Sequence, residues 1–339
     1  MYKSMERTET GAIQTSSTPD IPSITPHKST TLTMSTSSSS LNILVVGGSR
    51  HIGYHAALRL LDAGATVHYL LRNPAVFDAD ERVQAHVQAG RARLHKGDAL
   101  NEDSTREVWS KASEERPVDL LLFTVGFTGA PKFSLTKGII INPANLVTQC
   151  LLNLLCTMPK PTASTEIQTK LIILTSSGVT RASRALVPIP LKAMFGYLIA
   201  HPLADKFASE RVLAYVAGWD AEGADKTKGK GKGKDAPKYK WDGALEPEPS
   251  TDLTGEGWKN RTGLPARGTL PHAMILRAGL LTDGECRADA ATDGKPVYRV
   301  AEGELGGYTI SRKDVAHFIL EAVTKRWSEY GDRQVNVVY

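Results

Sequence analysis

The chain has 339 residues, of which 41% are hydrophobic and 23% are charged, enough apolar side chain to bury a substantial core. Its net charge of +5 is concentrated in one segment, since residues 226–240 read KTKGKGKGKDAPKYK, so the charge is no argument for a nucleic-acid partner. The sequence contains neither a long apolar run nor a secretion signal. We therefore expect a cytoplasmic protein without a membrane contact, with the mitochondrial matrix as the alternative compartment.

The cysteines and the first forty residues give two further predictions. Cys150, Cys156 and Cys286 are an odd number without metal-ligand spacing, which predicts three buried thiols and no metal site. Residues 1–40 are rich in Ser, Thr and Pro and have too few apolar side chains to pack, so we expect a disordered tail, and Met34 is an alternative start.

From Leu41 onward, short apolar runs alternate with amphipathic stretches, which is typical of alternating strands and helices. The runs expected to be strands are Asn42–Val46, Thr66–Leu71, Arg91–His95, Val118–Thr124 and Lys170–Thr175. The stretches between them with apolar residues at helical spacing are Ile52–Ala63, Asp80–Ala89, Glu102–Glu115 and Pro143–Met158. The strands are apolar on both faces, so the pattern predicts one α/β domain over 41–339, a doubly wound parallel sheet of Rossmann type with helices on both faces.

The second half of this domain is interrupted. A helix is expected at Leu203–Ala217 and a sixth strand at Ala273–Arg277. Residues 219–269 between them are long, polar and Lys/Gly-rich, so we expect a flexible insertion at the surface. Ser311 is placed to cap a helix that ends near Thr324, with Asp314 reaching back as in a capping box.

A phosphate-binding loop is the strongest functional signal. The strand Asn42–Val46 leads into Gly47-Gly48-Ser49-Arg50-His51-Ile52-Gly53, and an amphipathic helix follows at once. This is the context that a dinucleotide fingerprint requires: glycines for a tight turn and close packing, and backbone N–H groups at the helix start for a pyrophosphate. Arg50 stands where the middle glycine of the fingerprint is usual, and its guanidinium offers the phosphates a cation.

The ends of the next strands indicate which dinucleotide binds. An NAD site places Asp or Glu at the end of the second strand, whereas Arg72 stands there in this chain and can bind a 2′-phosphate, so we expect NADP(H) to be preferred over NAD(H). Asp98 ends the third strand and could accept from the adenine amino group or form a simple turn. Ala99 and Thr124, at the ends of the third and fourth strands, are expected to line the same site.

With these residues in hand, the chain resembles the atypical or extended branch of the short-chain dehydrogenase/reductase superfamily, including NmrA-like proteins and biliverdin-IXβ (flavin) reductase. The resemblance covers roughly Leu41–Ala217 and His272–Thr324. The stretches that carry it are VVGGSRHIG, YLLRN, KGDALNEDS, LIILTSSGV, ADKFASERVL, MILRAGLLTDG and GGYTISRKDVAHFIL. They are specific for the superfamily and not for one activity.

The resemblance also implies a catalytic set and one departure from it. The family's strand-end hydroxyl maps to Ser176 or Ser177, and the lysine of its Tyr-x-x-x-Lys motif maps to Lys206. The tyrosine position holds Pro202, so the proton donor of the usual mechanism is missing, and His201 or a water is the substitute to consider. For both serines the alternative is a polar cap on a strand end, and for His201 it is an ordinary helix-entrance residue.

These residues favour an NADP(H)-dependent oxidoreductase that transfers hydride between nicotinamide and a small carbonyl or conjugated acceptor. The missing tyrosine keeps open a non-catalytic NADP(H)-binding sensor of the NmrA-like kind. A nucleotide-sugar epimerase or dehydratase is a weaker alternative, because those reactions depend on the phenol. The sequence does not indicate the acceptor or the oligomeric state.

Overall fold

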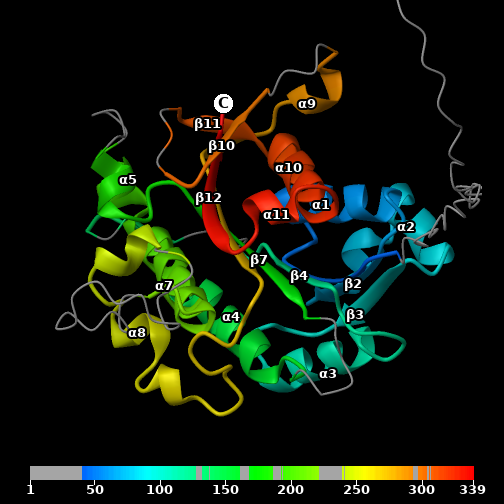
Figure 1. Cartoon of the computed structure of the whole chain (residues 1–339), viewed down its shortest axis with the longest axis horizontal. Coiled ribbons are helices and arrows are strands. Elements are labelled where there is room, and N and C mark those ends of the chain that lie inside the picture. Colours follow the sequence, from blue (N-terminus) through cyan, green and yellow to red (C-terminus); the bar gives the residue numbers. More distant parts are fainter. Residues whose placement is uncertain are drawn as a thin grey trace, which may run out of the picture. The chain divides into compact units, whose positions relative to one another are not determined.

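The central element of the fold is an eight-stranded sheet, in a computed structural model (Figure 1). The structure describes residues 40–126, 132–136, 138–160, 168–185, 192, 194–220, 239, 241–292, 297–303, 305 and 307–339, with the backbone alone at 194 and 195. The predicted tail and most of the Lys/Gly run lie outside these residues. The described chain from Ser40 to Tyr339 forms one compact unit.

Seven strands of this sheet run parallel and one is antiparallel, in the order β10-β12-β8-β7-β4-β1-β2-β3. Its strands are β1 (Asn42–Val46), β2 (Thr66–Leu71), β3 (Ala92–Lys96), β4 (Leu120–Phe123), β7 (Lys170–Ser176), β8 (Ala273–Ala278), β10 (Arg299–Ala301) and β12 (Arg333–Val338). The chain builds outward from β1 to β3 and then reverses through β4 to β12, so the order changes direction between β1 and β4. The predicted doubly wound Rossmann-type fold is confirmed, and ligands of such folds bind at this switch point.

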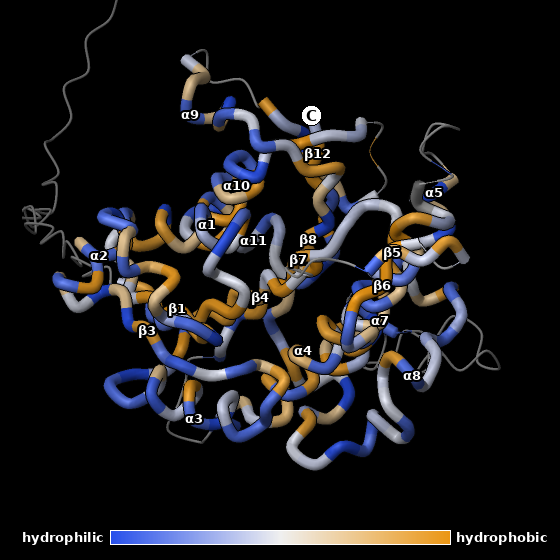
Figure 2. Tube along the Cα trace, turned by 180° about the vertical axis from the view of Figure 1, so that it is seen from behind, coloured by the Kyte–Doolittle hydropathy of each residue, from blue (hydrophilic) through white to orange (hydrophobic). Residues whose placement is uncertain are grey.

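The longer helices cover the two faces of the sheet. They are α1 (His51–Asp62), α2 (Glu81–Gln88), α3 (Glu102–Ala112), α4 (Leu146–Thr157), α7 (Ala200–Ala217) and α10 (Arg312–Thr324). In β1 the side chains alternate between two apolar clusters: Ile43 and Val45 pack with α1 and α10, whereas Leu44 and Val46 pack with α3, α4 and α7. Figure 2 shows the apolar segments of β1, β4 and β7 running through the interior between these layers. Strand periodicity therefore places one apolar layer on each face.

Shorter elements lie at the strand ends and in the connections. They are β5 (Lys132–Ser134), β6 (Gly138–Ile140), β9 (Leu280–Thr282), β11 (Thr309–Ser311), α5 (Arg181–Ala185), α8 (Thr251–Thr254), α9 (Arg287–Ala290), α11 (Trp327–Tyr330), the 3-10 turns Pro74–Phe77, Asp242–Leu245 and Trp258–Asn260, and the π-helical turn Met194–Leu198. Strands β5 and β6 form an antiparallel hairpin, while β9 and β11 pair in parallel. No helix among the described residues is both long and apolar enough to cross a bilayer.

Several boundaries differ from the sequence prediction. The third strand begins at Ala92, because the Arg91 N–H bonds to the His86 carbonyl and closes α2 instead. The fourth strand is shorter than Val118–Thr124. Helix α7 begins at Ala200, three residues before the predicted start, with Pro202 in its first turn, where no N–H donor is needed. Strand β12, which follows the last predicted helix, was not predicted.

Two further expectations differ from what the structure describes. The described part of the expected surface insertion, 241–269, is packed into the molecule, because Trp241 is fully buried and Trp258 is 8% exposed in the core cluster of α4 and α7. Cys156 is half-buried, unlike the buried Cys150 and Cys286.

The cap of α10 is only partly the predicted capping box. The Ser311 hydroxyl accepts from the Asp314 N–H, as expected for a cap. The Ser311 N–H, however, bonds to the Tyr339 hydroxyl, so the Asp314 carboxylate instead receives the Ser311, Tyr339 and Cys286 side chains and two backbone N–H groups. Burial alone would raise the pKa of Asp314, but these donors hold it below its usual range. Asp314 thus fixes the C-terminal strand to the helix.

Candidate functional site

The phosphate loop lies where β1, α1 and β4 meet. Gly47 has φ +88°, which favours glycine, and a Cβ there would lie 2.7 Å from the Thr124 carbonyl carbon. A Cβ on Gly53 would lie 2.3 Å from Thr124 Oγ1 and 2.5 Å from the Gly47 oxygen. Each glycine therefore permits close packing of the loop against β4. Arg50 is the N-cap of α1, but its side chain makes no cap hydrogen bond. The backbone N–H groups of the first turn therefore point out of the helix N-terminus, where an anion can accept from them.

A cavity of about 670 Å³ opens beside this loop. It is lined by every residue that the sequence predicted for cofactor binding: Gly47, Gly48, Ser49, Arg50, His51, Ile52, Gly53, Arg72, Asp98, Ala99, Thr124 and Lys206. These residues come from five separate segments, and the fold brings them to the edge where the strand order reverses. Among the described residues of its lining, Arg50, Arg72 and Lys206 are cations, Arg312 is paired with Asp283 at 2.7 Å, and Asp98 is the one carboxylate, so the lining suits a polyanionic ligand.

Lys206 is positioned by the residue before it. Asp205 is fully buried on α7, and its carboxylate accepts from the Val147 N–H at 2.7 Å and the Thr148 N–H at 3.0 Å. It therefore caps the first turn of α4 from a neighbouring helix, a role that Asn145, the N-cap residue itself, does not fill. This contact fixes α7 against α4. Burial lowers the pKa of the Lys206 ammonium to about 8, an effect that the Glu210 and Asp205 carboxylates partly oppose.

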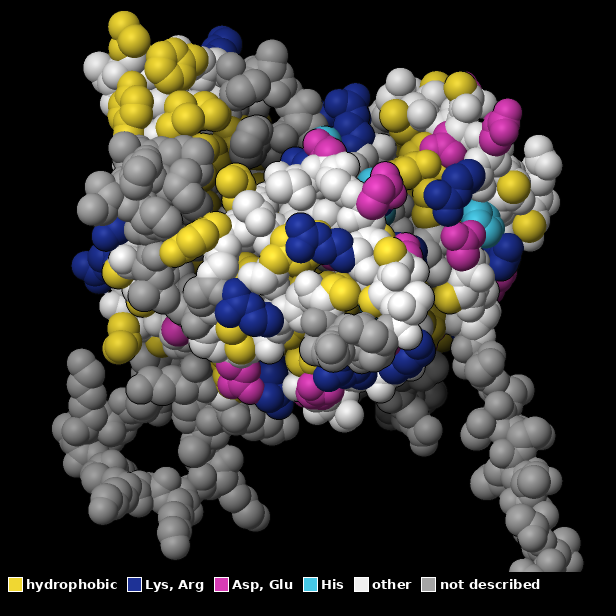
Figure 3. Space-filling model, turned by 90° about the horizontal axis from the view of Figure 1, so that it is seen from above, with side chains coloured by type: hydrophobic (Ala, Val, Ile, Leu, Met, Phe, Trp, Pro, Cys, Tyr) yellow, Lys and Arg dark blue, Asp and Glu magenta, His cyan; other side chains and the backbone are white. Residues whose placement is uncertain are grey.

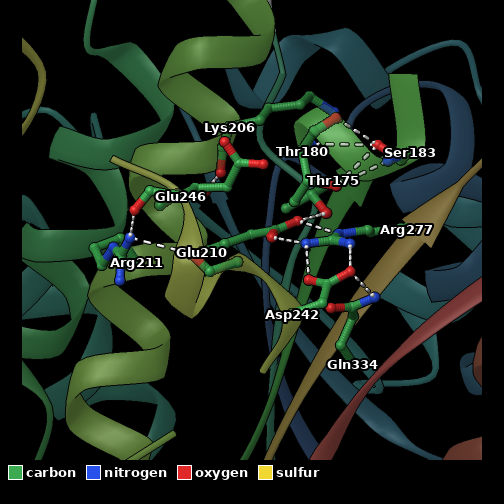
Figure 4. Close-up of polar contacts among 12 residues, drawn as sticks. Thr175, Thr180, Ser183, Lys206, Glu210, Arg211, Asp242, Glu246, Arg277 and Gln334 are labelled. Carbon is green, nitrogen blue, oxygen red and sulfur yellow. Dashed lines mark hydrogen bonds and ion pairs between the residues drawn. The ribbon is translucent and has the colours of Figure 1, made fainter. Parts of the chain in front are cut away.

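One turn further along α7, Glu210 belongs to a buried ion cluster (Figure 4). Its carboxylate accepts from Arg277 Nε at 2.9 Å and Nη2 at 2.6 Å, and from the Thr175 hydroxyl at 2.6 Å. Asp242, from the connecting segment, accepts from the other side of the Arg277 guanidinium at 2.8 and 2.9 Å. Burial alone would lower the pKa of Arg277, but the Glu210 and Asp242 carboxylates raise it above its usual range.

This cluster joins four parts of the chain that are distant in sequence. Arg277 and Glu210 are both fully buried, so each charge depends on its partner. Thr175 stands near the end of β7, next to Ser176, and Arg277 occupies the neighbouring position on β8. The cluster therefore fixes α7, with Lys206, against the strand ends. Sequence analysis quoted Arg277 only as part of a motif and treated the segment of Asp242 as insertion, so it missed the cluster.

The structure does not bring the other predicted catalytic residues to the cavity. Ser176 and Ser177 lie half-buried at the end of β7, and neither lines the cavity. The Ser176 hydroxyl donates to the Ser177 carbonyl at 3.0 Å, which is the strand-end polar cap considered as the alternative. His201 is exposed in the first turn of α7 and does not line the cavity either. Of the four residues, Lys206 is the one in the cavity lining.

The lining also contains residues that the sequence reading did not assign to the site. Arg312 is the first residue of α10, and Leu281 belongs to β9. Leu146 and Cys150 come from one face of α4, and burial raises the pKa of the Cys150 thiol to about 12. The apolar periodicity of α4 predicted burial but could not show that its first turn faces a cavity. Arg312 follows a recognisable cap residue, and nothing in the local sequence marks it as part of the site.

No protein-family model matches the sequence. The curated "Reductase pytE" of Aspergillus terreus is 27% identical over 172 residues, which is 50% of this chain and 48% of that protein. The chain therefore spans about half the length of the curated relative that it matches.

Solved structures with a similar fold include a short-chain dehydrogenase from Burkholderia cenocepacia J2315 in complex with NADP, with 15% identity, a TM-score of 0.49, and 88% of this chain and 96% of that one covered. Another is YwfH, an NADPH dependent reductase involved in bacilysin biosynthesis, with 13% identity, a TM-score of 0.47, and 88% and 98% covered. Assignment to the NmrA-like or biliverdin-IXβ reductase-like branch stays a prediction.

Proposed function

We propose that the protein is an NADP(H)-dependent oxidoreductase acting on a small carbonyl or conjugated acceptor. The observation that carries this proposal is the cavity at the switch point, lined by the whole predicted fingerprint together with Arg72, Asp98 and Lys206. When bound, the nicotinamide cofactor supplies or accepts the hydride. The reductase name of the partial relative is in keeping with this activity.

The charges that line the cavity support such a cofactor. The described lining of the cavity has more cations than carboxylates, which matches a dinucleotide that carries a pyrophosphate and a further phosphate. The uncapped first turn of α1, with Arg50, would hold the pyrophosphate, Arg72 the 2′-phosphate, and Asp98 the adenine amino group. Lys206 would hold the reacting end, since it lies on the opposite side of the switch point, on α7.

The cofactor preference is tested at Arg72. Arg72→Ala should lower NADP(H) affinity by about tenfold to a hundredfold, because a hydrogen bond between charged groups contributes about 1.5–3 kcal/mol, and should leave NAD(H) affinity unchanged. Titration by nucleotide fluorescence measures both constants. Arg106→Ala on the exposed face of α3 is the matched control. Equal binding of NADP+ and NAD+ by the wild type would refute the assignment.

Activity is tested by following NADPH absorbance with quinones, flavins, biliverdin and aldehydes as acceptors. Turnover with any of them should be lost in Lys206→Ala and retained in Lys111→Ala, whose side chain pairs on the surface with Glu107. Retention of full activity by Lys206→Ala would exclude the proposed role of this lysine.

A second function, an NADP(H)-binding sensor without catalysis, is favoured by one observation. Neither Ser176 nor Ser177 nor His201 lines the cavity, and Pro202 replaces the expected tyrosine, so none of these positions brings a proton donor to the cavity. Saturable NADP(H) binding without turnover of any acceptor would support the sensor over the enzyme.

A further inference from the structure

The β5–β6 hairpin exposes apolar side chains that the proposed cofactor site does not use. Phe133 is 60% exposed and Leu135 is 86% exposed. Phe133 lies on β5 opposite the partly exposed Ile139, and Leu135 stands in the turn that directly follows this strand. Tyr197, 40% exposed on the neighbouring π-helical turn, extends this surface. We call Phe133, Leu135, Ile139 and Tyr197 the hairpin face.

The hairpin face is held in place by specific contacts. The Tyr197 hydroxyl donates to the Ser134 carbonyl at 3.1 Å and also bonds to the Leu135 carbonyl. A Cβ on Gly138 would lie 2.3 Å from the Tyr197 carbonyl oxygen, so this glycine allows the hairpin to pack tightly on the turn. The exposed apolar side chains are therefore presented on a packed element. Large apolar side chains grouped on a surface in this way mark an interaction site.

The charge around the hairpin face is one-sided. Lys132 is the first residue of β5, and Lys192 stands two residues before the π-helical turn that carries Tyr197. Lys132 and Lys192 are exposed, while Arg181 is paired with Glu246. Figure 3 shows hydrophobic side chains gathered at the upper left, with no Asp or Glu among the described side chains visible there. The partner must therefore tolerate or attract positive charge.

We propose that the hairpin face docks onto an anionic lipid bilayer surface. Apolar side chains at a hairpin tip can enter the acyl boundary, a tyrosine is well suited to the interface, and flanking lysines attract anionic headgroups. A second copy of the chain fits less well, because a two-fold contact would bring like charges such as Lys132 together. The absence of a long apolar run led the sequence analysis to expect no membrane contact, but a hairpin contributes only a few side chains and leaves no such run.

The β5–β6 hairpin lies next to the cavity in the chain and in the fold. The hairpin is inserted between two cavity-lining segments, Thr124–Gly126 after β4 and Leu146 at the start of α4. Strand β6 also packs against α7, the helix that carries Lys206. Docking would therefore bring the Lys206 side of the cavity near the lipid, where an apolar acceptor concentrates.

The test is sedimentation of the full chain with phosphatidylcholine vesicles, with and without phosphatidylserine. The wild type should bind the vesicles that contain phosphatidylserine, and Phe133→Ser with Leu135→Ser should weaken binding by at least about tenfold. Lys132→Glu reverses one charge and should weaken it by at least about fivefold, since one surface lysine contributes about 1 kcal/mol. Both changes are at exposed positions and should leave the far-UV spectrum unchanged.

The control is Leu280→Ser, which removes a side chain 45% exposed in the separate β9–β11 sheet and should bind as the wild type does. Wild-type protein that stays in solution with every vesicle would overturn the proposal. So would self-association in sedimentation velocity that the double variant abolishes, because the hairpin face would then be an interface between copies. Vesicle binding needs no cofactor, so failure here is distinguishable from failure of the proposed activity.

Discussion

The two ends of the cavity are built in different ways. At the β1–β3 end, one continuous stretch from Asn42 to Asp98 supplies the loop, Arg72 and Asp98. At the α7 end, Lys206 is held by Asp205 and by a cluster in which Arg277 bonds to Asp242 and Glu210, 35 and 67 residues away in sequence. The first end depends on backbone conformation and local order, whereas the second depends on buried charges that satisfy one another.

The largest effect is expected from breaking the cluster. Arg277→Met leaves the buried Glu210 and the neighbouring Asp242 without their cation, so it should lower the free energy of unfolding by about 3–5 kcal/mol. Urea unfolding followed by circular dichroism measures this loss. Arg106→Met, which removes an exposed pair, should cost less than about 1 kcal/mol. Adding Glu210→Gln to Arg277→Met should restore part of the stability, and a double variant less stable than the single one would contradict the buried-charge account.

At the β1–β3 end, the free energy of unfolding should depend on pH. His68 on β2 is buried, with Nδ1 3.0 Å from His95 Nε2, and burial lowers its pKa from 6.5 to about 4. Below about pH 6.5 the His68 imidazole binds a proton in the unfolded chain but not in the folded one. The contribution of His68 to the free energy of unfolding is therefore complete above that pH and is lost as the pH drops toward 4. The loss should reach about 3 kcal/mol in urea titrations.

His68→Gln should flatten this pH dependence. His201→Gln, at an exposed position, should leave it unchanged. Equal pH dependence in the His68 variant and the wild type would show that another group is responsible.

The phosphate loop should be sensitive to a single methyl group. Gly53→Ala forces a Cβ to within 2.3 Å of Thr124 Oγ1, and relieving it should displace the loop and weaken NADP(H) binding by about tenfold to a hundredfold, from overpacking of about 1–3 kcal/mol. Gly303→Ala, where a Cβ has nothing within 4 Å, is the control. Unchanged NADP(H) affinity in Gly53→Ala would mean that the loop tolerates displacement or does not bind the nucleotide.

The smallest effect concerns Lys206. Because its pKa is lowered to about 8, the ammonium loses its proton as the pH rises through that value, and NADPH affinity should fall by roughly fivefold above it. Fluorescence titration across this range measures the change. Lys206→Met should remove the step, and a step that persists in this variant would assign the titration to another group.

The same comparison explains what the sequence could predict. The loop, Arg72 and Asp98 follow from strand-to-helix order, because each stands at a fixed place relative to its own element. Long-range partners carry no such mark: Asp242 lies in a polar stretch without apolar periodicity, and its contact with Arg277 exists only in the folded chain. Strand β12 escaped prediction because Gln334 and Asn336 alternate with valines and suggest a solvent-facing edge. Both amides are buried and donate to backbone carbonyls at 302 and 303.

Of the catalytic residues inferred from the resemblance, fewer line the cavity than of the cofactor-loop residues. The position of a lysine on a helix follows from the position of the helix, and Lys206 on α7 lines the cavity. Ser176 and Ser177 depend on how the chain leaves β7, where the hydroxyl of Ser176 turns to the next carbonyl. Alignment of the motif preserved the strand end but could not give the direction of its side chains.

The burial of Trp241 has an optical consequence. Its ring stacks on Phe207 with centroids 5.6 Å apart, and the Arg211 guanidinium lies 4.9 Å from its centroid. An indole so enclosed emits at short wavelength and shifts to the red when water reaches it. With the other four tryptophans changed to phenylalanine, emission from Trp241 alone would report whether the segment carrying Asp242 stays seated while the rest of the sheet remains folded.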